Sequence, residues 1–350
     1  MAIFQSLVKK EALHIVRDRR TMLITLVMPL VLLLLFGFTI STEVNDVRIA
    51  VVAEQHNDEV RGIIERFKAN DYFTFLGLAS ADETESLLRA GKTDAVLFLR
   101  TSDGKVKSQI VIDASNTSTA KAMTGYIQGV LRGTDMGNPV LTYTLYNPQL
   151  KSSYNFVPGI MGMIFILICA IMTSVSIVRE KESGTMDLLL VSPARPGVII
   201  LGKLVPYLLL SCAILTIMLL MAYTVLGLPV SENIINVVLV SLLYITLSLS
   251  IGLLISTLVN TQLTALIVSA VLFMLPVIML SGMIFPIDNM PDVLQWISCV
   301  IPARWYIEAM RKLMIQQLGV GYIANEIIIL LLMTVILLAV SVKKFSLGKR

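Results

Sequence analysis

Long apolar stretches dominate the pattern of hydrophobic and polar positions along this chain of 350 residues. A helix that crosses a membrane needs roughly 20 mostly apolar residues. Backbone polar groups cannot stay unpaired in hydrocarbon, so runs of this length must be helical. The segments that qualify are Met22–Ile40, Val157–Val178, Ile199–Leu226, Ile234–Val259, Leu263–Met283 and Ile323–Val342. The pattern predicts an α-helical polytopic membrane protein with six transmembrane helices, the first of them within residues 22–42 and the others within 157–342.

Residues 1–21 have helical periodicity instead of a continuous apolar run. The apolar face holds Ile3, Phe4, Leu7, Val8, Ala12, Ile15 and Val16, and the polar face holds Gln5, Lys9, Lys10 and Arg17. A basic amphipathic helix beside a span is expected to lie in the cytoplasmic membrane interface, and the alternative is a helix packed on protein. The first apolar run is longer than the core of a signal peptide and no small-x-small site follows, so an uncleaved anchor is expected.

Residues 43–156 separate the first two spans and alternate between strand and helix patterns. The predicted strands and helices, in chain order, are Val47–Ala53, Glu59–Lys68, Tyr72–Leu76, Asp82–Arg89, Asp94–Leu99, Lys107–Ile112 and Thr119–Leu131, of which the second, fourth and last are helices. Such alternation predicts an inserted mixed α/β domain. A segment of this length is sufficient for its own core.

Lysine and arginine residues that flank the spans predict the orientation. One side collects Lys9, Lys10, Arg17, Arg19, Arg20, Arg179, Lys181, Arg195, Lys203, Lys343, Lys344, Lys349 and Arg350. The opposite side has only Arg304, Arg311 and Lys312 between spans five and six. The chain is therefore expected in the inner membrane of the cell. Both termini, including the tail at 343–350, are expected in the cytoplasm, and the α/β domain is expected outside.

Composition excludes several classes of protein. Charged residues make up 15% of the chain, against about 25% in soluble domains. No long basic run is interleaved with aromatic residues, so nucleic-acid binding is not predicted. The cysteines (Cys169, Cys212 and Cys299) form no close pair and predict neither a disulfide framework nor a zinc site. The only histidines, His14 and His56, lie outside the spans, which argues against a histidine-dependent intramembrane hydrolase.

Ionisable residues are nearly missing from the predicted spans. Lys203 lies at the cytoplasmic foot of span three, where its ammonium is expected to reach water, and Glu326 lies near the outer end of span six. A proton- or sodium-coupled carrier usually has carboxylates near mid-membrane. None is predicted there, so the energy for any transport is expected to come from another subunit.

Gly91-Lys92-Thr93 resembles the end of a phosphate-binding P-loop. The motif requires glycine five residues before Gly91, and Ser86 stands there. We therefore predict a turn between a helix and a strand.

The most distinctive polar stretch, Arg179–Pro193, begins where span two ends. Thr185 is suited to cap a helix, Asp187 is favourable in its first turn, and Pro193 follows its end. The stretch predicts a short helix near 183–192 that lies on the membrane. It is either a plain interfacial loop or an element that a cytoplasmic partner presses.

A second distinctive stretch, Leu280–Tyr306, contains both tryptophans of the chain. Tryptophan favours the membrane boundary. Pro286, Pro291 and Pro302 divide the region into short helices near 284–322. These helices are expected to form either an external cap or an exit gate.

Together the two stretches resemble the type-2 ABC transporter permeases, the membrane subunits of ABC exporters. The family pattern R-E-x-E-x-G-T-x-x-x-L-x-x-x-P, followed by G-K, matches Arg179, Glu180, Glu182, Gly184, Thr185, Leu189, Pro193, Gly202 and Lys203. The second pattern, S-G-x-x-F-P and then P-x-x-W/Y-x-x-E-x-x-R, matches Ser281, Gly282, Phe285, Pro286, Pro302, Trp305, Glu308 and Arg311. The entry to span two also fits at Tyr154, Pro158 and Gly159.

The resemblance implies that the helix near Thr185–Val191 is a coupling helix that docks on an ATPase subunit. The implied coupling residues are Arg179, Glu180, Glu182, Gly184, Thr185, Asp187, Leu189, Pro193 and Lys203, and the eight residues of the second pattern would form the external gate. This chain would bind no cofactor, because ATP and Mg²⁺ belong to the partner ATPase. A second permease, identical or a sister, is a further implied partner, and the external domain suits contact with a periplasmic adaptor.

The function implied is export of a drug-, lipid- or ion-like substrate, driven by ATP hydrolysis on the separate subunit. The alternative is a membrane-anchored receptor or scaffold whose external domain binds a ligand. Six spans with a cytoplasmic docking motif argue against it, since one or two spans would suffice.

Overall fold

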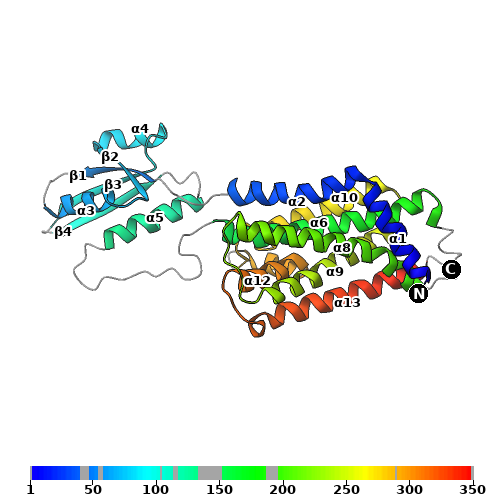
Figure 1. Cartoon of the computed structure of the whole chain (residues 1–350). Coiled ribbons are helices and arrows are strands. Elements are labelled where there is room, and N and C mark those ends of the chain that lie inside the picture. The colour runs from blue at the N-terminus through cyan, green and yellow to red at the C-terminus, as the bar shows by residue number, and fades with distance from the viewer. Residues whose placement is uncertain are drawn as a thin grey trace. The chain divides into compact units, whose positions relative to one another are not determined.

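The computed structural model describes residues 2–39, 47–53, 58–102, 105–112, 117–132, 152–186, 196–287 and 290–347. The chain divides into two compact units. One unit is a helical bundle made of Met1–Ile40 and Ser153–Arg350, and the other is an α/β domain made of Ser41–Ser152 (Figure 1).

The bundle contains long apolar helices. Its helices are α1 (Ala2–Arg17), α2 (Arg19–Thr39), α6 (Ser152–Glu182), α8 (Pro196–Thr224), α9 (Ile234–Leu258), α10 (Gln262–Leu280), α11 (Asp292–Ser298), α12 (Pro302–Met314) and α13 (Ala324–Leu347). Within the described residues, α6, α8, α9, α10 and α13 are each long and apolar enough to cross a membrane. The bent pair α1 and α2 supplies a sixth candidate. The predicted multi-pass helical membrane fold is thereby confirmed.

The junction of α1 and α2 bends the chain by 68°. Asp18 separates the two helices; its backbone amide bonds to the His14 carbonyl at 3.1 Å, and its carbonyl accepts from Met22 at 2.9 Å. Aspartate is favoured where a helix begins. The amphipathic segment predicted at residues 1–21 is therefore a separate helix that ends at Arg17.

Close packing at the centre of the bundle depends on small residues. A Cβ on Gly252 of α9 would lie only 2.6 Å from the backbone oxygen of Ala170 in α6. Tyr244 of α9 stacks on Tyr306 of α12, with ring centroids 4.2 Å apart, and its hydroxyl donates to the Gly162 carbonyl at 2.9 Å. Small residues and internally bonded hydroxyls are the usual means of packing helices in a membrane.

The α/β domain is built on one four-stranded sheet of order β2-β1-β3-β4. Its elements are β1 (Val47–Ala53), α3 (Asp58–Lys68), β2 (Phe73–Leu78), the 3₁₀ helix η1 (Ala81–Glu83), α4 (Thr84–Arg89), β3 (Ala95–Ser102), β4 (Lys105–Ile112) and α5 (Thr117–Arg132). Strand β1 pairs in parallel with β2 and β3, and β4 pairs with β3 in the antiparallel direction. The inserted mixed domain predicted from the alternating pattern is thereby confirmed.

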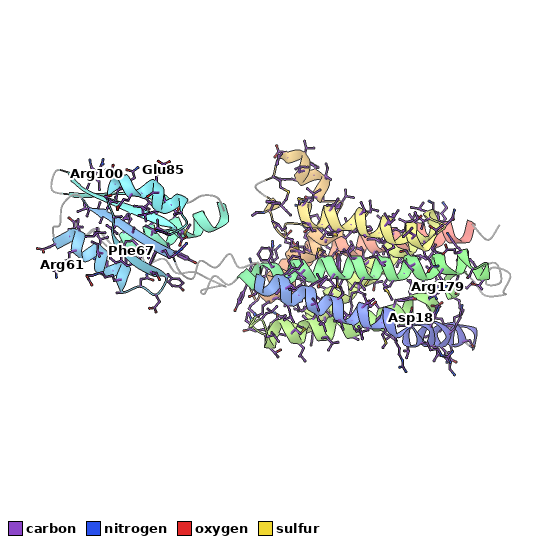
Figure 2. The ribbon with its side chains drawn as sticks, turned by 90° about the horizontal axis from the view of Figure 1, so that it is seen from above. Asp18, Arg61, Phe67, Glu85, Arg100 and Arg179 are labelled. Carbon is purple, nitrogen blue, oxygen red and sulfur yellow. The ribbon has the colours of Figure 1, made fainter. Side chains whose placement is uncertain are left out.

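Helices cover both faces of this sheet (Figure 1). On one face, α3 and α5 bury Phe67 and Ile127 against the strands, and the Phe67 ring meets Phe73 edge-on at 4.9 Å. Figure 2 labels Phe67 within this domain. On the other face lies α4, which ends at Arg89 and is followed by Gly91 with φ of +61°. The Lys92 amide donates to the Leu87 carbonyl at 3.0 Å, so Gly91-Lys92-Thr93 forms the predicted turn.

Helix ends depart from the predicted spans by a few residues, and two of these departures lie beside the distinctive stretches. Helix α6 continues to Glu182 instead of stopping at Val178, because Arg179–Glu182 are good helix formers. Helix α10 stops at Leu280, before the predicted end at Met283. Gly184 and Gly282 have φ of +72° and +80°, and glycine is the residue that adopts this conformation at helix ends at little cost.

Candidate functional site

The predicted coupling stretch begins inside α6. Arg179–Glu182 form the last turn of that helix, and the Ser183 amide donates to the Arg179 carbonyl at 3.0 Å. The Thr185 hydroxyl lies 3.3 Å from the Glu180 carbonyl, to which it donates, and the backbone of Thr185 and Met186 is helical. Asp187, Leu189 and Pro193 lie outside the described residues, so the coupling helix stays a prediction.

A buried ion cluster joins three helices beside this stretch. Lys203 of α8 is only 2% exposed, and its Nζ lies 3.2 Å from Glu11 Oε1 of α1. Lys203 also pairs with Glu180 of α6, whose Oε1 lies 2.6 Å from Lys10 Nζ. The prediction that Lys203 reaches water is wrong, because Glu11 and Glu180 provide it with partners inside the protein. A buried ammonium requires such partners.

Sequence reasoning missed Glu11, although its position carried a signal. Glu11 is four residues from both Leu7 and Ile15, so it lies on the apolar face of the amphipathic helix. Leu7 and Ile15 pack against the core of the bundle, and Glu11 is 2% exposed. A carboxylate on an apolar face indicates a buried partner. Val16, predicted on the same face, is 59% exposed.

Gly202 explains how α1 comes close to α8. A Cβ at Gly202 would lie 3.0 Å from Leu7 Cβ, a tight contact. The G-K pair of the family pattern therefore has two roles here: Gly202 admits α1, and Lys203 binds its carboxylate.

Lys181 and Glu182 attach the end of α6 to the link between α9 and α10. Lys181 donates to the Ser256 carbonyl and, at 3.3 Å, to the Val259 carbonyl. Glu182 accepts from the side-chain amide of Gln262 at 2.6 Å. Glu180 is buried, so it is a positioning residue that holds α6 against α1 and α8. Glu182 is exposed, so another protein can reach it.

A pocket of about 380 Å³ lies beside the cluster, at the junction of α1 and α2 and against α6, α8 and α10. Its polar wall consists of His14, Asp18, Ser176, Arg179, Tyr207 and Gln262. Figure 2 shows Asp18 and Arg179 at the same end of the helical bundle. Sequence analysis did not predict this pocket, because its walls come from separate helices.

The second predicted stretch forms short helices at the end of the bundle that holds α12 (Figure 1). Pro291 immediately precedes α11 and Pro302 is the first residue of α12, as the proline positions predicted. The 3₁₀ helix η3 (Val320–Ile323) then leads into α13. Proline suits the first helical position because it lacks the amide hydrogen that would stay unpaired there.

Arg311 and Gly282 fix α12 to the end of α10. The Arg311 Nη2 donates to the Gly282 carbonyl at 2.8 Å. Buried Ser281 donates to the Val277 carbonyl one turn earlier, while Phe285 is 51% exposed and Pro286 is exposed. The structure thus brings Ser281, Gly282 and Arg311 together and leaves Phe285 and Pro286 on the surface.

Trp305 and Arg304 hold α12 against α11. Trp305 Nε1 donates to the Cys299 carbonyl at 2.9 Å. Arg304 Nη1 donates to the Gln295 carbonyl at 2.9 Å, and its guanidinium lies 5.0 Å from the centre of the Trp305 ring. Side chains of α12 therefore bond backbone carbonyls in the C-terminal half of α11 and at the residue that follows it.

Lys312 connects α12 to α13. Its Nζ lies 2.6 Å from Glu326 and 3.1 Å from Glu308. Burial lowers the pKa of the Lys312 ammonium, but the hydrogen bonds to Glu326 and Glu308 outweigh burial and raise that pKa above its ordinary value. Burial also lowers the pKa of Arg311, and the nearby Glu308 opposes this change.

Comparison with known proteins decides the family. Residues 19–343 match the sequence profile described as "ABC-2 family transporter protein". The chain belongs to the ABC-2 transporter family. That assignment covers both distinctive stretches and the inserted domain, and it agrees with the resemblance to type-2 ABC permeases.

Several relatives of this ABC-2 family chain are similar over nearly its whole length. It is 29% identical to the "Probable multidrug ABC transporter permease YbhS" of Escherichia coli strain K12, over 97% of this chain and 94% of the relative. It is also 29% identical to the "Probable multidrug ABC transporter permease YbhR" of the same strain, over 94% of each chain. "ABC transporter G family member 20" of Dictyostelium discoideum is 30% identical over 53% of this chain and 26% of that protein. This chain is therefore a multi-pass transport permease.

Proposed function

We propose that this chain is the membrane subunit of an ABC exporter and moves a drug-, lipid- or ion-like substrate out of the cytoplasm. A separate ATPase subunit, which binds ATP and Mg²⁺, would provide the energy. The observation that carries the proposal is the buried cluster of Glu11, Glu180 and Lys203. It fixes α1, α6 and α8 to one another on both sides of the segment 187–195, which contains most of the coupling helix that family resemblance puts near Thr185–Val191.

A rigid junction at that place is what mechanical coupling requires. A force on the segment 187–195 acts on the end of α6 and the start of α8 in sequence. Because Glu180 and Lys203 are bound to Lys10 and Glu11, α1 moves with them. Exposed Arg179, Glu182 and Thr185 are suited to contact the ATPase, together with Asp187, Leu189 and Pro193.

The opposite end of the bundle supplies the candidate exit gate. Arg311 links the end of α10 to α12, and Lys312 links α12 to α13. Tilting of the long helices would therefore move α12 with its neighbours. In this proposal both termini are cytoplasmic, the α/β domain is external, and a second permease completes the pathway. The α/β domain is then suited to contact between permeases or with a periplasmic adaptor.

Copurification tests the proposal. The tagged full chain is purified from its native membranes under mild conditions, and associated proteins are identified by mass spectrometry. We expect a P-loop ATPase in about equal amount with wild type. Glu182→Lys, or deletion of Thr185–Leu189, should lower its recovery at least several-fold while membrane insertion persists.

Glu59→Lys is the matched control, because Glu59 is exposed on α3 of the other unit. This variant should recover the ATPase like wild type. Absence of any nucleotide-hydrolysing partner from wild type, together with uptake or release driven by an ion gradient, would reject the exporter assignment. Normal transport by the deletion variant would reject the coupling segment alone.

A membrane-anchored receptor or scaffold is the second candidate, and the observation in its favour is the inserted domain with its own core. Under that hypothesis, a ligand would bind Ser41–Ser152 and no ATPase would copurify. The same purification therefore separates the two functions.

A further inference from the structure

The pocket beside α1 has an apolar wall and a cationic mouth. Its apolar lining is Ile15, Met22, Ile171, Met172, Val175 and Leu266. Arg179 and His14 line it as well, and both side chains are exposed, so they lie where the pocket meets the surface. A cavity of about 380 Å³ is in the lower part of the range for small-molecule sites.

The charges at the mouth favour an anion. In the part of the chain that the structure describes, the Arg179 guanidinium has no hydrogen bond or ion pair. Asp18, the acidic residue of the lining, already takes part in an interaction of its own. An unpaired guanidinium is well suited to bind phosphate through two parallel hydrogen bonds.

The surroundings favour a ligand from the bilayer over a soluble anion. Met22 and Leu266, from α2 and α10, both line the pocket. Neighbouring side chains on these helices are exposed, with Ile24 at 61% and Leu263 at 69%, as expected for surfaces that face lipid. A free phosphate would leave the apolar wall unfilled, whereas an acyl chain would fill it.

We infer that this pocket binds an anionic phospholipid of the leaflet that faces the cytoplasm. One acyl chain occupies the apolar wall and the phosphate lies against Arg179. Basic pockets between membrane helices on the cytoplasmic side are known to hold anionic head groups. The assignment to that leaflet rests on the proposed orientation; the binding itself depends only on the pocket.

The bound lipid would also influence coupling, a step that rests on the proposed function. Gln262 in the pocket wall is bonded to Glu182, and Arg179 lies in the same last turn of α6. An acyl chain in the pocket would fix the distance between α1 and the start of α10, and therefore the position of the end of α6 that is bonded to it. We therefore expect the lipid to change the rate at which the assembled transporter hydrolyses ATP.

Lipid retention by the full chain tests the binding. The protein is reconstituted into nanodiscs of phosphatidylethanolamine with phosphatidylglycerol, extracted, and examined by native mass spectrometry. Wild type is expected to retain phosphatidylglycerol in preference to phosphatidylethanolamine. Arg179→Gln should weaken retention about five-fold, the effect of one cation near anionic lipid. Leu266→Trp, which fills the pocket, should abolish it.

Two matched variants control for charge and bulk outside the pocket. Arg17→Gln removes a nearby exposed cation, and Leu263→Trp places the same ring on a part of α10 that does not line the pocket. Both should retain lipid within two-fold of wild type. If Leu266→Trp fails to give a monodisperse protein, Arg179→Gln compared with Arg17→Gln still tests the inference.

Three results would overturn the binding site: equal retention of both phospholipids by wild type, unchanged retention by Arg179→Gln, or displacement of the lipid by millimolar inorganic phosphate. The last would identify a soluble anion as the ligand.

The coupling step has its own test. If phosphatidylglycerol is retained but the ATPase rate does not depend on it, the coupling step is rejected and the binding site stands. Failure to copurify an ATPase would reject the proposed function instead.

Discussion

The two ends of the helical bundle use charged side chains in different ways. At the end that holds α1, Lys203 is 2% exposed and binds carboxylates from two other helices. At the end that holds α12, Arg304 and Arg311 donate to backbone carbonyls at helix ends, and Lys312 is about a quarter exposed.

The difference shows where the bundle is expected to be rigid. Removing one partner of a buried ion pair leaves an uncompensated charge in a low-dielectric interior. The arginines of the α12 end donate to neutral carbonyls, so opening one of their bonds leaves no carboxylate without its partner and costs less. The α1 end is therefore suited to transmit force, and the α12 end is suited to rearrange.

The largest effect is expected from breaking the buried cluster. Lys203→Met leaves the Glu11 and Glu180 carboxylates without their shared partner and should cost roughly 3–5 kcal/mol of stability. The thermal unfolding midpoint of the purified full chain provides the measurement. Adding Glu11→Gln to Lys203→Met should recover part of the loss. An unchanged midpoint for Lys203→Met would show that the cluster does not stabilise the α1 end.

Glycines that end helices provide the next comparison. Gly282→Ala forces a side chain onto a residue with φ of +80° and brings its Cβ within 3.2 Å of Ile287. We expect a loss of about 2–3 kcal/mol from backbone strain and crowding. Gly184 has a similar φ of +72° with nothing nearby, so Gly184→Ala should cost only about 1–2 kcal/mol. Equal unfolding midpoints for the two variants would contradict the tighter packing around Gly282.

The smallest effect is expected at Lys312. Lys312→Met combined with Glu326→Gln should cost about 1 kcal/mol, because the Lys312 side chain is 25% exposed and solvent screens the pair. The second change avoids leaving the buried Glu326 carboxylate, 4% exposed, without its partner. The pKa of Lys312 is raised in the folded chain. Its contribution to the stability of the fold is therefore fully present below the ordinary lysine pKa of about 10.4. It is lost only as the pH rises through the raised value. Unfolding midpoints should therefore differ from wild type by a constant amount between pH 7 and 9; a difference that falls within this range would contradict the assigned pairing.

Local sequence patterns predicted most of the elements of the fold. The strand at Val47–Ala53 has the predicted bounds, and α3 begins one residue before its predicted start. The short helices after Pro291 and Pro302 also follow the prediction. These features depend on periodicity and on proline and glycine geometry, which act over a few residues.

The candidate site was predicted less completely. Its motif residues were found from family resemblance, but the burial of Glu180 and Lys203 was not. Glu11 and Lys203 are 192 positions apart in the chain, and no local pattern relates residues at such a distance. The extension of α6 to Glu182 was missed for a different reason: charged residues were taken as the end of the helix because they end the apolar run.

The sequence by itself determined the membrane-embedded class, the positions of the spans and the presence of an inserted α/β domain, because hydrophobic length and period decide which segments leave water. Only the tertiary structure decided that Lys203 lies between Glu11 and Glu180 and that Arg179 lines a pocket with Met22 and Leu266. Those relations depend on which helix faces pack together, and packing joins residues whose separation along the chain carries no information.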